Sequence, residues 1–121
     1  MSATSSQPFD LDALKVSLEA HDPAASAAIY APDAVVETFN RDHGPGDPVV
    51  VRGLEALQAQ AVEVASRNLT HRVDRAVAGD TSGASQVTCT YPDGLKVLCM
   101  STFDHENGRI TRETRMEVWD A

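Results

Sequence analysis

The chain has 121 residues, of which 42% are hydrophobic and 23% charged, and these proportions are typical of one globular domain. Eighteen acidic against ten basic residues give a formal net charge of −8, which disfavours nucleic acids and anionic membranes as partners. No apolar run approaches the ~18 residues of a membrane span and no secretory signal is recognisable, so we expect a cytoplasmic protein with a disordered tail over residues 1–8 and one domain over residues 9–121.

The first part of the chain predicts two helices. Leucines recur at helical spacing behind Asp10, a good capping residue, which predicts a helix over residues 9–20. Asp22 and Pro23 then supply a cap and a first-turn residue for a short second helix over residues 24–31.

The middle of the chain predicts a strand, a loop and a long helix. Residues 34–39 are mostly β-branched or aromatic and predict a strand. The segment Asn40–Pro48 is rich in Gly, Pro, Asp and Asn, which favours an exposed loop of the kind that borders sites. Residues 54–68 predict a helix whose core-facing stripe is Leu54, Leu57, Ala61, Val64 and Ala65.

The remaining residues predict a meander of strands separated by turn signals, with Asn107-Gly108 favouring a tight hairpin. The expected fold is therefore α+β: three helices packed on the concave face of a curved, cone-shaped antiparallel or mixed sheet. A partly covered concave sheet leaves a hollow that is a default ligand site. The four predicted strands cover residues 69–78, 85–91, 95–103 and 109–119.

Four segments in this order resemble the nuclear transport factor two-like superfamily, which includes ketosteroid isomerases, scytalone dehydratases, limonene epoxide hydrolases and SnoaL-like polyketide cyclases. The segments are AHDPAASAAIYAPDAVVE, VRGLEAL, LTHRVDRAVAGD and FDHENGRI. The resemblance covers nearly the whole chain and implies the cone-shaped fold, a small apolar ligand and a homodimer formed through the sheet. It does not imply one reaction, because this fold hosts both enzymes and binding proteins.

The resemblance to ketosteroid isomerases places the catalytic base at Thr38, the donor tyrosine at Leu14 and the donor aspartate near Cys99. None of these side chains can play the corresponding part, so a ketosteroid isomerase is not expected. The Arg-Asp-Asp set of the epoxide hydrolases is also incomplete, because Arg115 occupies the position of the second aspartate.

The last strand admits two interpretations. Apolarity alone places Ile110, Met116 and Val118 in the core and leaves the opposite face to solvent. The resemblance instead implies that the opposite face points into the hollow and that the apolar face packs against a second subunit. That opposite face carries Glu113, Arg115, Glu117 and Trp119.

His71 shares strand parity with apolar neighbours and is the preferred general acid or base, although an inward histidine is more often a core residue. Cys89 and Cys99 are expected to be small buried hydrophobes, because no His or Lys adjoins either in sequence, although a bridge between them stays possible. Asp104, His105 and Glu106 are expected to be solvated at a hairpin tip. We expect neither a metal nor a cofactor.

Three hypotheses follow for the function. The first is a cofactor-independent enzyme of proton-transfer type, an isomerase, cyclase, dehydratase or hydratase acting on an apolar small molecule. The second is a non-catalytic ligand-binding module, and the third is an assembly subunit whose hollow is filled by its own side chains. For the first, the predicted catalytic residues are His71, Glu113, Arg115 and Glu117, and the predicted substrate-binding residues are Tyr30, Val36, Thr38, Cys89, Cys99, Phe103 and Trp119.

Overall fold

The computed structural model describes residues 9–20 and 22–120. The expected tail, residues 1–8, lies outside the described residues. Over the described ranges the chain forms three helices, α1 (Leu11–Glu19), α2 (Pro23–Ala28) and α3 (Leu54–Ala65), and one six-stranded sheet. Its strands are β1 (Tyr30–Phe39), β2 (Val49–Arg52), β3 (Thr70–Ala78), β4 (Ser82–Thr90), β5 (Lys96–Glu106) and β6 (Arg109–Trp119).

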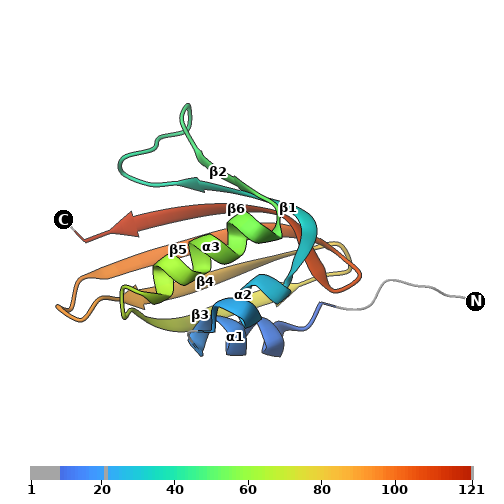
Figure 1. The fold of residues 1–121 in the computed structure, drawn as a ribbon, viewed down its shortest axis with the longest axis horizontal. Helices are drawn as coiled ribbons and strands as arrows, with labels where there is room; N and C mark the ends of the chain where they lie inside the picture. Colours follow the sequence, from blue (N-terminus) through green and yellow to red (C-terminus); the bar gives the residue numbers. More distant parts are fainter. Residues whose placement is uncertain (1–8, 21, 121) are drawn as a thin grey trace, which may run out of the picture.

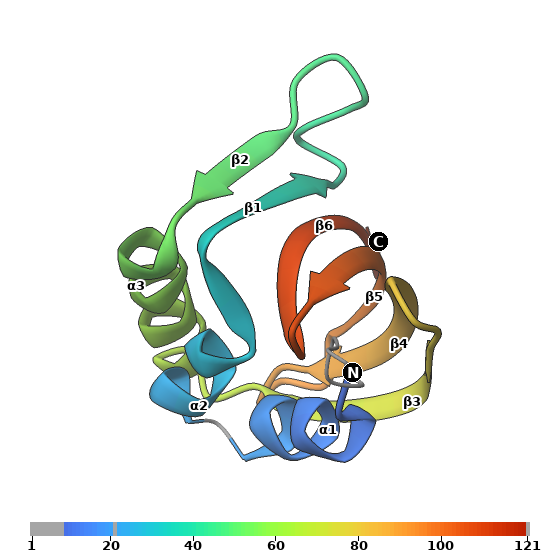
Figure 2. The same ribbon diagram turned by 90° about the vertical axis from the view of Figure 1, so that its right-hand side faces the viewer.

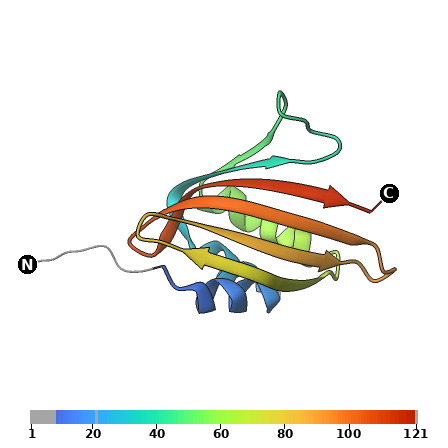
Figure 3. The same cartoon turned by 180° about the vertical axis from the view of Figure 1, so that it is seen from behind.

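The sheet has the order β2-β1-β6-β5-β4-β3 and is mixed, since β1 and β6 run parallel while the other neighbours are antiparallel. It curves around the helices without closing, and α1, α2 and α3 lie on its concave side (Figures 1 and 2). The opposite side of the sheet carries no helix of the described chain (Figure 3). The predicted α+β cone is thus confirmed.

The first two helices begin where their caps predict. The Asp10 carboxylate accepts a hydrogen bond from the Ala13 amide at 3.0 Å, and the Asp22 carboxylate accepts one from the Ala24 amide at 3.1 Å. Each carboxylate satisfies amides that have no partner inside the helix, which fixes the start of α1 and α2. The long third helix ends at Ala65, three residues before the predicted end.

The second helix was predicted to run to residue 31, and this is wrong. α2 ends at Ala28, and Tyr30 already belongs to β1, where it pairs with Ile110 of β6. The Ile110 amide donates to the Ile29 carbonyl at 2.8 Å, so pairing with a distant strand overrides the local helical preference. The prediction also missed β2, which is short and pairs with β1 at the sheet edge.

A β-bulge puts Ile110 on the opposite face of β6 from Met116 and Val118. Ile110 pairs with His105, whereas Arg112 pairs with Asp104, which leaves Thr111 as an extra residue in β6. Ile110 is therefore buried in the core, with 1% of its surface exposed, although its parity in the sequence matches that of Met116 and Val118. Those two residues are exposed, so the interpretation that puts all three in the core is wrong.

The predicted hairpin at Asn107-Gly108 is confirmed, because both residues have positive φ angles, 53° and 77°. The expectation that His105 is solvated is wrong. Its side chain is buried beside Phe9, and its Nε2 lies 2.8 Å from the Gly79 carbonyl, which also fixes the end of β3. Strand β5 simply continues further toward the turn than the sequence indicated.

Two apolar clusters border the interior. The larger joins α1, β1, α3 and β6 and includes Leu14, Val36, Leu57 and Ile110. The smaller lies where β4 meets β5 and contains Val87, Cys89 and Val97. A cavity lies between the helices and the concave face, and residues of both clusters line it, among them Leu14 and Leu57 of the larger and Val87 and Val97 of the smaller.

Candidate active site

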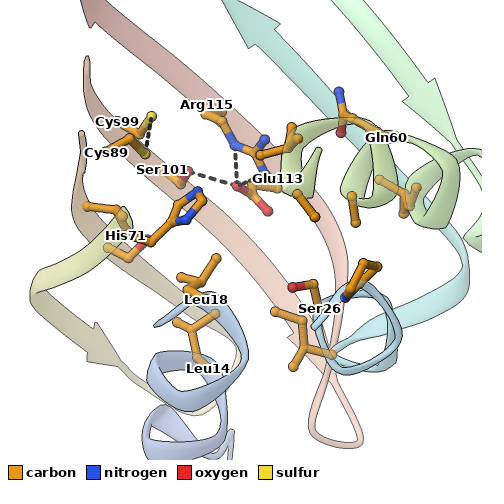
Figure 4. Close-up of a pocket in the computed structure, with 18 of the residues that line it drawn as sticks. Leu14, Leu18, Ser26, Gln60, His71, Cys89, Cys99, Ser101, Glu113 and Arg115 are labelled. Carbon is orange, nitrogen blue, oxygen red and sulfur yellow. Dashed lines mark hydrogen bonds and ion pairs between the residues drawn. The ribbon is translucent and has the colours of Figure 1, made fainter. Parts of the chain in front are cut away.

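The cavity has a volume of about 180 Å³ and lies between the concave face of the sheet and the three helices (Figure 4). An apolar cavity of about 150 Å³ holds a benzene-sized molecule, so this one has room for roughly one ring. Its presence contradicts the hypothesis of an assembly subunit with a filled interior. Most of its lining is apolar, and its polar lining residues include Tyr30, His71, Ser101, Glu113, Arg115 and Glu117.

A buried carboxylate, Glu113 of β6, organises one wall. Its Oε1 accepts a hydrogen bond from the Tyr30 hydroxyl, and its Oε2 accepts one from the Ser101 hydroxyl at 2.8 Å. The guanidinium of Arg115 donates to the same Oε2 from Nε at 3.2 Å and from Nη2 at 3.1 Å. We call Tyr30, Ser101, Glu113 and Arg115 the Glu113 cluster.

The Glu113 cluster holds a fixed pair of charges. Burial alone would raise the pKa of Glu113, but Arg115 and the hydrogen bonds from Tyr30 and Ser101 outweigh it and lower that pKa. Burial and the adjacent carboxylate raise the pKa of Tyr30, so its phenol stays protonated and remains a donor. Glu113 is therefore ionised and fully hydrogen-bonded, which suits it to hold Arg115 in place and makes it a poor proton acceptor.

A second polar group lines the cavity on the β3 and β4 side. The strand register sets His71 directly opposite Cys89, and the Sγ atoms of Cys89 and Cys99 are 4.0 Å apart. Both cysteines are free. Figure 4 shows the His71 ring projecting into the same space that Arg115 and Glu113 border. No local pattern associates His71 with Cys89, because 17 residues separate them along the chain.

The rim of the cavity includes the end of β6 and the loop that follows β1. Glu117 accepts a hydrogen bond from the Asn40 side chain at 3.3 Å, and the Arg41 guanidinium stacks 5.0 Å from the centre of the Trp119 ring. Arg41 thus reaches the rim, as the loop composition suggested, whereas the imidazole of His43 lies 3.2 Å from the Asp47 carboxylate within the loop. Lining residue Arg67 is exposed, so the cavity reaches the surface near the end of α3.

The structure brings most of the predicted site residues together. All four predicted catalytic residues line the cavity, as do Tyr30, Cys89, Cys99, Phe103 and Trp119. Val36 and Thr38 do not line it, contrary to the prediction. Val36 is completely buried within the larger apolar cluster, and Thr38 is buried further along β1.

Sequence reasoning missed Ser101, which holds Glu113. The period of a strand could have identified it, because side chains two residues apart on a strand share one face. Four such residues of β5 line the cavity: Val97, Cys99, Ser101 and Phe103. Two further polar lining residues, Ser26 and Gln60, come from the helices, and no spacing rule identified them.

Within residues 9–20 and 22–120, no group of three or more His, Cys, Asp or Glu side chains is arranged to hold a metal ion. None of the helices described is long and apolar enough to cross a membrane.

The sequence of the chain matches one known protein family. The sequence model of the SnoaL-like domain matches residues 12–113. None of the curated proteins compared with the chain matches its sequence.

Several solved structures share the fold. A proposed ketosteroid isomerase from Kribbella flavida superposes with a TM-score of 0.72 at 19% identity, covering 91% of this chain and 74% of that one. An NTF-2 like protein of unknown function from Burkholderia xenovorans gives 0.75 at 20% identity, covering 92% and 81%. A proposed polyketide cyclase from Sinorhizobium meliloti gives 0.66 at 18% identity, covering 87% and 91%. At such identities the likeness shows the fold alone.

Proposed function

The chain belongs to the family of SnoaL-like domains, and from this premise we propose that it is a cofactor-independent enzyme that transfers protons on a small apolar carbonyl compound. The reaction class is that of an isomerase, cyclase, dehydratase or hydratase. Similar structures carry the names ketosteroid isomerase and polyketide cyclase, which supports this class without selecting one member.

One observation carries the proposal: a paired cation, Arg115, stands in the wall of a mainly apolar cavity that His71 also lines. Removing a proton beside a carbonyl develops negative charge on the oxygen, and a preorganised cation in a low-dielectric site stabilises that charge. The bonds to Glu113 and Tyr30 use Nε and Nη2 of Arg115. We assign its Nη1 group to the substrate oxygen.

His71 is the group we assign to proton transfer, because imidazole both accepts and donates a proton near neutral pH. Glu113 is a positioning residue, since its oxygens are bonded to Tyr30, Ser101 and Arg115. Glu117 lies nearer the rim, where its carboxylate is bonded to Asn40 and can relay a proton to solvent. Leu14, Leu18 and Phe103 provide the apolar contacts for the carbon skeleton.

The cavity volume restricts the substrate. About 180 Å³ accommodates roughly one ring, so we expect a monocyclic or short-chain compound and not a four-ring steroid. This agrees with the replacement of the ketosteroid isomerase residues at Leu14, Thr38 and Cys99.

The test measures exchange of the α-protons of cyclohexanone in D₂O by NMR, with and without the protein. We expect the protein to accelerate exchange, and His71→Gln to lower that acceleration by about 10²–10⁴-fold. Arg115→Met should also lower it, whereas Arg112→Gln, at an exposed arginine of the same strand, should not. Acceleration that survives both His71→Gln and Arg115→Met would refute the assigned site.

A second candidate function is non-catalytic binding of the same kind of molecule. It is favoured by the completeness of the Glu113 cluster, whose carboxylate oxygens are already occupied. A non-catalytic binding protein would show saturable binding of cyclohexanone in calorimetry and no proton exchange above the background rate.

A further inference from the structure

The cavity contains a pair of thiols that the proton-transfer mechanism does not use. Cys89 stands opposite His71 in the pairing of β3 with β4, and Cys99 approaches Cys89 from β5 with 4.0 Å between the Sγ atoms. Both thiols line the cavity. The sequence suggested inert cysteines, because no basic residue adjoins either one along the chain, but the strand register supplies that neighbour.

The two thiols differ in their surroundings. An S–H donated by Cys99 lowers the pKa of the Cys89 thiol; burial opposes this shift, while His71 and Arg115 add to it. The same contact with Cys89, together with burial, raises the pKa of Cys99. These directions make Cys89 the more acidic thiol of the pair.

The groups near Cys89 come from three other strands and from α1. They are His71 from β3, Cys99 from β5 and Arg115 from β6, with Leu18 of α1 closing the apolar side. Glu117 of β6 acts on Cys99, raising the pKa of that thiol. This arrangement places an imidazole, a second thiol and a cation near the Cys89 sulfur, inside a cavity that reaches solvent.

We propose that Cys89 is a nucleophilic thiolate that adds to small conjugated carbonyl compounds entering the cavity, with His71 and Cys99 as its positioning residues. A lone pair of Cys89 Sγ forms a bond to the β-carbon, and the C=C π pair moves toward the carbonyl oxygen. The resulting enolate then takes a proton at its α-carbon from water, which replaces the proton that the thiol lost on ionising. The product is a thioether, so thiol and alkene combine without an oxidant.

This inference goes beyond the proposed function, because adduct formation needs no turnover. The conjugated carbonyl is the favoured electrophile for two reasons. A thiolate prefers soft carbon centres, and Arg115 in the same cavity can stabilise the enolate oxygen. A disulfide is less favoured, because Cys89 pairs with Val97 while Cys99 pairs with Val87, and such diagonal positions are about 7–8 Å apart.

The test treats the folded protein with methyl vinyl ketone at about pH 6, where an ordinary thiol is almost entirely protonated. Peptide mass spectrometry then locates the adduct. We expect it on Cys89 before Cys99, although the side chain of Cys99 is the less buried of the two. The rate should exceed that of N-acetylcysteine by about tenfold or more, since each unit of lowered pKa raises the thiolate fraction about tenfold.

Variants and a large reagent distinguish activation of the Cys89 thiol from its accessibility. His71→Phe and Cys99→Ala should each slow addition at Cys89 by about tenfold, and Cys89→Ser should abolish it. Circular dichroism verifies folding, and His71→Leu or Cys99→Val replaces any variant that does not fold, since neither side chain can donate a hydrogen bond. A polyethylene-glycol maleimide, which is too large for the cavity, should leave Cys89 unmodified.

Three results would overturn the inference: reaction at Cys99 first, no adduct on Cys89 of the folded protein, or unchanged rates in both positioning variants. Rapid labelling by the large maleimide would also overturn it, because the thiol would then react outside the cavity. Adduct formation is read from peptide mass and not from turnover. The thiol adduct can therefore be absent while α-proton exchange persists, and the adduct can form while exchange is absent.

Discussion

Arg115 forms a 3.1 Å ion pair with Glu113, which precedes it by two residues on the same face of β6. The Glu113 side chain is only 6% exposed and that of Arg115 only 24%, so the pair lies in the wall of the cavity. Water can replace little of this interaction, because few solvent molecules reach either charge.

Glu113→Gln should therefore destabilise the fold. The variant keeps the shape of the side chain but leaves Arg115 without its counter-charge, at a cost of about 3 kcal/mol in the free energy of unfolding. Urea unfolding measures the loss. The matched control is Arg112→Gln, which breaks the exposed pair with Glu37 and should cost less than about 1 kcal/mol. Equal losses in the two variants would contradict the importance of the buried pair.

The contribution of Glu113 should depend on pH. The pKa of the Glu113 carboxyl in the folded protein is below its usual value of 4.5. The stabilising effect of Glu113 is therefore complete above pH 4.5, and it is lost as the pH falls through the folded pKa. We expect the difference in unfolding free energy between the wild type and Glu113→Gln to shrink from about pH 6 to about pH 3. Glu106→Gln, at an exposed position of β5, should change stability by less than about 0.5 kcal/mol. A pH-independent difference would be inconsistent with the lowered pKa.

Gly83 is required by close packing within β4. A Cβ added there would lie 2.6 Å from the Val77 carbonyl oxygen and 2.5 Å from Phe103 Cζ. Because one of these atoms belongs to the backbone, Gly83→Ala should destabilise the protein by about 1–3 kcal/mol. Gly46→Ala is the control, since no described atom lies within 4 Å of its added Cβ. Thermal unfolding compares the two, and equal midpoints would show that the sheet yields at Gly83.

The outer face of the sheet presents an apolar patch, and we propose that it forms the interface of a homodimer. Met100 and Met116 are paired across β5 and β6 and are 47% and 56% exposed, with Val118 beside them at 65% (Figure 3 shows this side of the sheet). A Lys at this face would place an unpaired charge in the interface, which costs several kcal/mol.

Met116→Lys should therefore give a folded monomer in analytical ultracentrifugation, while the wild type sediments as a dimer. The control is Val62→Lys on α3, where the side chain is equally accessible at 53% but lies on the helical side of the molecule. A monomeric wild type, or a dimeric Met116→Lys, would exclude this interface.

The sequence by itself determined the features that depend on neighbouring residues. The caps at Asp10 and Asp22 and the hairpin at Asn107-Gly108 were all predictable, because each depends on hydrogen bonds or φ angles within a few residues. The alternation of charged residues around Arg115 also indicated a polar strand face. The resemblance to a known superfamily predicted that this face points into the hollow. These signals were sufficient for the fold class and for placing most of the predicted site residues in the cavity.

Tertiary structure alone decided the features that depend on strand register. The bulge at Thr111 buries Ile110, pairing with β6 converts Tyr30 from helix to strand, and the alignment of β3 with β4 sets His71 against Cys89. A shift of one residue in register reverses every side chain of a strand, and no local preference fixes that shift. The cavity, and the placement of Cys89 opposite His71 within it, therefore follow from long-range pairing, which only the folded chain defines.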